Sequence, residues 1–211
     1  MVIKGIVALV LPPIVGPAPQ NGLLLARISA KKFAVHVFYS KAQARELIER
    51  YRKGTPEHQI PLALTSVDEA ELPEASERDA VVVGGDAALR IASSVHAAMR
   101  LGRPHAAEYR MIDFFVPVKP GVKHGVALFK EGDEAVMYVI RSKGQARHIA
   151  RHYRHRMPDP TRLKIEESIR RSTLPEESSE AETVIEGCAA QRLAAWFSAE
   201  EAYRAIPRTY N

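Results

Sequence analysis

Two stretches of the chain, 102 residues apart, decide the fold: SKAQARELIERYRKGTPE at Ser40–Glu57 and SKGQARHIARHYRHRMPD at Ser142–Asp159. They belong to a longer match, in which residues 33–92 align with residues 135–194 without a gap and 20 of the 60 pairs are identical. A solenoid repeat has a period of about 20–50 residues, which is too short for this match. A period of 102 fits a small domain. The sequence therefore predicts a tandem duplication, with units at residues 1–105 and 106–211 that form an intramolecular pseudo-dimer.

The two copies predict one α+β unit of about 100 residues with the order β-β-α-(β)-β-α. Strands are expected at Leu23–Ile28 and Phe33–Tyr39, joined as a hairpin, with counterparts at Val126–Lys130 and Ala135–Arg141. The helices that follow begin at Ser40 and Ser142. Helices covering one face of a mostly antiparallel sheet are the predicted architecture. A strand is also expected at Ile60–Ser66, whereas its counterpart at 162–168 is polar and is expected to be helical or irregular. The remaining expected elements are short strands at Ala80–Val83 and Thr183–Ile185, and final helices near Ala87–Met99 and Ala189–Phe197.

The two quoted stretches carry a helix-start signal. Ser40 with Gln43, and Ser142 with Gln145, form the S-x-x-Q pattern of a capping box. Apolar residues then recur at helical spacing, which indicates one face packed against a core. These shared residues are better explained by helix capping than by catalysis.

Composition restricts the function classes. The chain has 211 residues, a net charge of +5 and a single cysteine, Cys188. One cysteine permits neither an intrachain disulfide nor a cysteine zinc site, which suits a cytoplasmic protein. No apolar segment reaches the ~20 residues of a membrane span, so no membrane association is expected. The modest positive charge favours an anionic partner.

Charge is the main difference between the copies. Between Arg141 and Arg156 there are six Lys or Arg residues and no acidic residue. Their spacing places four of them in one stripe along a helix, well suited to phosphate oxygens. The first copy keeps fewer cations and adds Glu46 and Glu49 among them. The predicted nucleic-acid-binding residues are Lys143, Arg147, Arg151, Arg154, Arg141 and Arg156, with Lys41, Arg45, Arg52, His148 and His152.

Other constellations give weaker signals. His148, His152 and His155 share a helix flank, but the surrounding arginines would repel a metal ion. The Gly84-Gly85-Asp86 turn matches no phosphate-loop pattern. Gly85 and Gly187 stand at matched positions, which suits a backbone site with positive φ. The sequence indicates no catalytic residue, no metal and no cofactor.

Three functions remain open. The first is a non-enzymatic nucleic-acid-binding protein, for DNA or RNA, that contacts the phosphate backbone through the basic helix of the second copy. The second is a protein–protein interaction adaptor, in which that helix is a solvated surface or meets an acidic partner. The third is an RNA-processing enzyme that uses a helix histidine such as His148 or His152.

Overall fold

The computed structural model describes residues 5–12, 21–101, 113–118, 123–131 and 134–205, although not the side chains of 97–101 and 199–205. It is an α+β fold with two four-stranded antiparallel sheets and six α-helices among these residues. The first half contains β1 (Gly5–Val10), β2 (Gly22–Ser29), β3 (Lys32–Phe38), α1 (Lys41–Tyr51), α2 (Gln59–Glu69), β4 (Val81–Val83) and α3 (Gly85–Leu101). The second half contains β5 (Asp113–Phe115), β6 (Gly125–Glu131), β7 (Glu134–Ile140), α4 (Lys143–His152), α5 (Asp159–Arg171), β8 (Thr183–Ile185) and α6 (Gly187–Ala205). A short 3₁₀ turn follows α1 at Arg52–Gly54 and follows α4 at Arg154–Arg156.

The two sheets have the same strand order. One sheet runs β1-β2-β3-β4 and the other β5-β6-β7-β8, with every neighbouring pair antiparallel. The central hairpins β2–β3 and β6–β7 match the predicted ones. Each half therefore has the order β-β-β-α-α-β-α, with one strand and one helix that the predicted unit lacked. The predicted boundary between the two units, at residues 105 and 106, lies outside the described residues.

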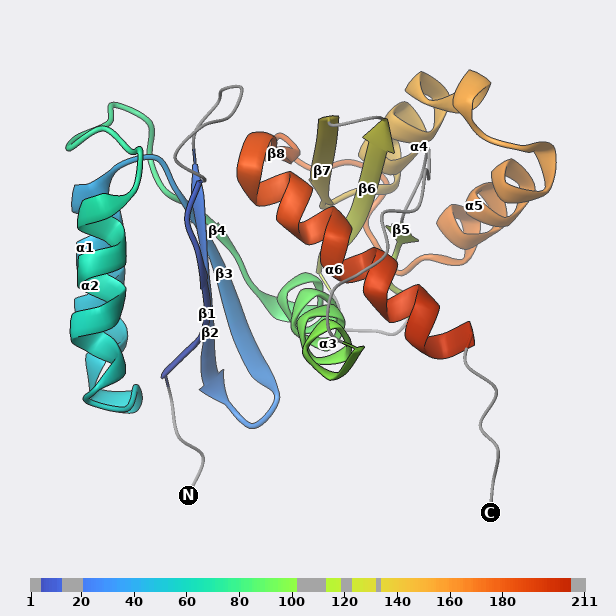
Figure 1. The fold of residues 1–211 in the computed structure, drawn as a ribbon. Coiled ribbons are helices and arrows are strands. Elements are labelled where there is room, and N and C mark those ends of the chain that lie inside the picture. The colour runs from blue at the N-terminus through green and yellow to red at the C-terminus, as the bar shows by residue number, and fades with distance from the viewer. Residues whose placement is uncertain (1–4, 13–20, 102–112, 119–122, 132–133, 206–211) are drawn as a thin grey trace, which may run out of the picture.

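The molecule is built in five layers (Figure 1). Helices α1 and α2 cover the outer face of the first sheet, and α4 and α5 cover the outer face of the second. Helices α3 and α6 lie between the two sheets. Both faces of each sheet are thus covered by helices, whereas the sequence predicted cover on one face only.

The alternation of side chains along a strand explains this layering. Leu23 and Leu25 in β2 enter the central core, while Leu24 packs on the outer side against α1 and α2. Val126 and Leu128 in β6 enter the same central core from the other sheet. One continuous core therefore joins the two halves.

The predicted caps are present in both halves. The backbone N–H of Gln43 donates to Ser40 Oγ at 3.3 Å, and that of Gln145 donates to Ser142 Oγ at 3.2 Å. Each glutamine Oε1 accepts from the residue before the cap, Tyr39 or Arg141, rather than from the cap residue. The LPE segments at 72–74 and 174–176 complete these helix ends, because their backbone carbonyls accept the first N–H groups of α1 and α4.

The predicted strand at Ile60–Ser66 is wrong, since these residues belong to α2. Ile60 and Val67 are buried about two helical turns apart, and Ala63 and Leu64 pack between them. This is the spacing of an amphipathic helix. In a short apolar run it cannot be distinguished from a buried strand by sequence pattern alone. The counterpart at 162–168 lies within α5, so the two halves agree at this place.

The amino-terminal apolar segment contains the edge strand β1. Among the described residues, none of the helices has the length and apolar character needed to cross a membrane.

A candidate basic groove

Helices α4 and α5 enclose a groove of about 370 Å³ on the outer surface of the second half. The 3₁₀ turn after α4 also lines the groove, with Arg154 at the rim of the groove and Met157, which follows the turn, on its floor. The lining residues are Arg147, Ala150, Arg151, Arg154, Met157, Arg162, Ile165, Glu166, Ile169 and Arg170. Five of these ten carry a guanidinium group and only one carries a carboxylate, so the groove is strongly basic.

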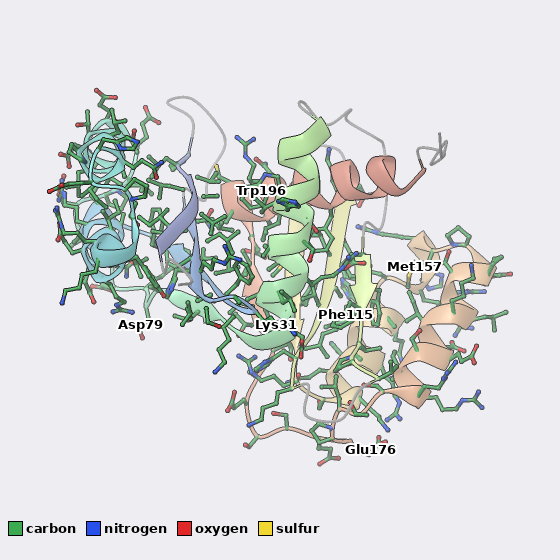
Figure 2. The ribbon with its side chains drawn as sticks, turned by 90° about the horizontal axis from the view of Figure 1, so that it is seen from below. Lys31, Asp79, Phe115, Met157, Glu176 and Trp196 are labelled. Carbon is green, nitrogen blue, oxygen red and sulfur yellow. The ribbon has the colours of Figure 1, made fainter. Side chains whose placement is uncertain are left out.

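The floor of the groove is apolar. Met157, Ile165 and Ile169 are 7%, 5% and 2% exposed, and they belong to the core that α4 and α5 form on the second sheet. Ala150 is half-buried beside them. Figure 2 shows Met157 at the α4–α5 end of the molecule. The groove therefore combines an aliphatic base with a rim of cations.

Three rim arginines are available to a ligand. Arg151, Arg154 and Arg170 are exposed, and none forms an ion pair with another described residue. Arg147 is shared, because its Nη1 lies 2.8 Å from the carboxylate of Glu176. Arg162 pairs with Asp159 at the start of its own helix. Unpaired guanidinium groups on a concave surface are a favourable arrangement for phosphate oxygens.

The other predicted cations of this half have structural partners. Arg141 Nε lies 2.9 Å from the carboxylate of Glu180, and its Nη1 donates to the Ala181 carbonyl at 2.8 Å. Lys143 lies 3.3 Å from Glu176, and together with Arg147 it holds the pKa of that carboxyl group below its ordinary value. Arg156 pairs with Glu131. Arg141, Lys143 and Arg156 thus form contacts within the fold and do not line the groove.

The predicted cations of the first half do not join the groove. Lys41 and Arg45 contact Glu74, and Arg45 also pairs with Asp68 at 2.5 Å. Arg52 pairs with Glu49 at 2.6 Å. Two sheets and the α3–α6 layer separate α1 from α4, so the two basic sets lie at opposite ends of the molecule (Figure 1).

Matched positions show where the charges at the two ends differ. At the offset of 102, the groove residues Arg151 and Arg170 correspond to Glu49 and Asp68. Arg162 corresponds to Ile60 of α2, which is buried in the core that α1 and α2 form on the first sheet. At three of the five groove arginines the first half therefore has a carboxylate or an aliphatic side chain, whereas Arg147 and Arg154 correspond to Arg45 and Arg52.

The histidines lie beside the groove and do not line it. His148 and His152 are exposed on the flank of α4, and the ring of His152 packs edge-on against Tyr153 at 4.8 Å between centroids. Within the described ranges, no group of three or more His, Cys, Asp or Glu side chains converges in a way that could hold a metal ion.

The turns before α3 and α6 have the predicted backbone. Gly85 and Gly187 have φ of +63° and +67°, the left-handed region that glycine tolerates best. Cys188 follows at the start of α6 and is half-buried. Both glycines thus serve the change of direction between a short strand and a helix.

Sequence reasoning missed the arginines of α5. Arg162 and Arg170 are eight residues apart, just over two helical turns, and so lie on one face. That spacing was the available signal. Without knowing that 162–170 is helical and packs beside α4, the sequence does not connect these residues with the stripe on α4.

Comparisons with protein-family models, with curated proteins and with solved structures find no match to this chain.

Proposed function

We propose that this protein binds nucleic acid without acting as an enzyme, and that the groove between α4 and α5 receives the phosphate backbone. The observation that carries the proposal is that three arginines around one groove, Arg151, Arg154 and Arg170, form no ion pair within the part of the chain that the structure describes. Contacts between guanidinium groups and phosphates dominate the affinity of proteins for nucleic acids. Helix α4 contributes no carboxylate to the groove, so Glu166 of α5 is the single acidic residue in its lining.

We also propose that the two halves arose by duplication and form an intramolecular pseudo-dimer. Twenty identities at a constant offset and one order of elements in both halves support this origin. Residues from the two halves also mix in the central core between the sheets. The proposed division of labour is that the first half supports the fold and the second half binds the ligand.

The proposal predicts a salt-dependent affinity for oligonucleotides. The affinity is measured by fluorescence anisotropy with labelled DNA and RNA, at 50 and 200 mM salt, about a fourfold range. Arg151→Ala and Arg170→Ala should each weaken binding about 5- to 10-fold and lower the slope of log K against log salt by about 1, because each removes one phosphate contact.

Arg52→Ala is the matched control, since it removes the same charge at the position that corresponds to Arg154. It should leave the affinity unchanged. No binding of either nucleic acid at 50 mM salt (about 14 Å Debye length, where phosphate contacts are strongest) would exclude the proposal. An equal loss in Arg52→Ala and Arg151→Ala would show that net charge, rather than the groove, governs binding.

A further inference from the structure

We infer that the ligand of the α4–α5 groove is single-stranded, with an unstacked base on the apolar floor and phosphates at the arginine rim. This inference rests on the proposed function and narrows its ligand class. It starts from the composition of the lining, which combines four aliphatic side chains with five arginines and one glutamate, Glu166.

The floor is the first argument. A phosphate gains nothing from contact with Met157, Ile165 or Ile169, because burial of apolar surface stabilises only apolar partners. A nucleobase has large apolar faces and stacks on flat or aliphatic surfaces in protein pockets. The groove therefore matches a ligand that carries both groups close together.

The shape is the second argument. The groove is a hollow of about 370 Å³ between two helices, not a flat stripe. In a duplex the bases are paired and stacked inside, and the phosphates are outermost. A duplex would place phosphates at the rim and leave the floor uncovered, whereas a single strand can turn a base inward.

The rim is the third argument. Arg151 projects from α4, Arg154 from the turn after it and Arg170 from α5, so cations stand on both sides of the floor. A strand crossing the groove meets cations on either side of the inserted base. Guanidinium planes also stack on bases, which adds contacts that a duplex cannot offer.

The first half supplies an internal comparison. The positions matched to Met157 and Arg162 hold Thr55 and Ile60. Thr55 is used within the fold, since its hydroxyl accepts from the backbone N–H of Ile6 at 3.0 Å. A hollow of about 420 Å³ beside β1 and α2 at that end does have apolar lining, including Leu62 and Ala63, but none of the described residues that line it is charged. That end therefore lacks the cationic rim.

The test compares a single-stranded oligonucleotide with the duplex of the same sequence and length, as DNA and as RNA. The single strand should bind about 10-fold more tightly at equal salt, the difference that one buried base provides. Equal affinity, or a preference for the duplex, would overturn this inference while leaving the proposed function intact. No binding of either form would instead contradict the proposed function.

A variant at the floor of the groove separates the contribution of the floor to affinity from that of the arginines at the rim. Ala150→Leu adds a branched side chain over the floor and keeps every arginine, and both residues are good helix formers. It should remove the preference for single strands, measured as the ratio of single-strand to duplex affinity. Ala42→Leu, on the exposed surface of α1, is the matched control and should leave this ratio unchanged. An unchanged preference in Ala150→Leu would overturn the inference.

The unaltered protein gives a second readout that does not depend on the folding of a variant. A nucleoside monophosphate should compete with the labelled single strand at concentrations about 10-fold lower than inorganic phosphate, because only the former covers the floor. Equal competition by the two would contradict a base on the floor.

Discussion

A few exchanged side chains separate the two ends of this molecule. Helices α4 and α5 follow the same order as α1 and α2, and α4 is capped by a serine as α1 is, so the order of elements does not distinguish the halves. The distinction lies in which charges face the space between the two outer helices. In the first half these charges cancel within the fold, as Arg45 with Asp68 and Arg52 with Glu49 show. In the second half, Arg151, Arg154 and Arg170 form no ion pair with any residue in the described ranges.

Another exchanged pair lies on the inner side of the same helices. His36 Nε2 lies 2.8 Å from Tyr51 Oη, and the matched pair is Tyr138 with Tyr153 at 3.0 Å. His36 is 2% exposed, and its Nδ1 has no hydrogen-bond partner. Burial, together with the charge of Arg50, lowers the pKa of His36 to about 4. The neutral imidazole is thus the form that the fold accepts.

His36 should make the protein sensitive to acid. Its folded pKa of about 4 lies below the ordinary value of 6.5, so the unfolded chain takes up the proton first. The stabilisation is complete above pH 6.5 and is lost as the pH falls toward 4, with about 2 kcal/mol lost between pH 7 and 5. Urea unfolding at both pH values measures this loss. In His36→Gln, which does not titrate, the free energy of unfolding should change much less; an equal loss in both proteins would refute the role of His36.

At the scale of elements, helix starts were the most predictable feature. Ser40 and Ser142 are the predicted N-caps of α1 and α4. In the structure both serines are buried, and the Oγ of each accepts a backbone N–H. Capping is a local interaction between near neighbours in sequence, so one chain suffices to recognise it. The Nε2 groups of Gln43 and Gln145 each donate to a backbone carbonyl 35 residues away, that of Arg78 or Glu180. These long-range hydrogen bonds have no signature in the local sequence.

Helix α2 and the groove could not be predicted in the same way. Ile60–Ser66 is short and apolar, and its helical spacing becomes decisive only when the sheet face that it covers is known. The groove requires α4 and α5 to pack side by side, which is a tertiary fact. Arg151 and Arg154 were therefore predicted as part of a stripe, while Arg170 and the floor emerged only from the structure.

The cap of α4 supports the groove, and its removal should be measurable. Ser142→Ala should lower the free energy of unfolding by about 1 kcal/mol, because the Gln145 N–H loses its acceptor at a buried helix end. Urea denaturation followed by circular dichroism checks this value. Ser40→Ala at the matched cap should have a similar cost but, being at the other end, should leave oligonucleotide affinity unchanged. A loss within about 0.2 kcal/mol of zero in both variants would argue against the capping role.

At the scale of the molecule, the halves are tied together at the centre and differ at the ends. Asn21, which is buried, donates to the Glu186 carbonyl at 2.8 Å and accepts from the Ala189 N–H at 3.0 Å, so a residue of the first half completes the start of α6. Arg90 on α3 pairs with Asp113 on β5 at 3.1 Å. The outer helix pairs face solvent at opposite ends (Figures 1 and 2). A change at one end therefore leaves the other end as an internal reference.

The most direct test of the account is a variant in which two groove arginines of the second half are replaced by the acidic residue types found at the matched positions of the first half. The double variant Arg151→Glu and Arg170→Asp installs at the groove the residue types found at Glu49 and Asp68. Titration of a labelled single-stranded oligonucleotide at 50 and 200 mM salt, about a fourfold range, should show tight, steeply salt-dependent binding by the unaltered protein and a loss of at least about 100-fold in the variant. Both substitutions are on exposed positions, so thermal unfolding should remain close to that of the unaltered protein. Retained affinity with an unchanged salt slope in a folded variant would contradict the account.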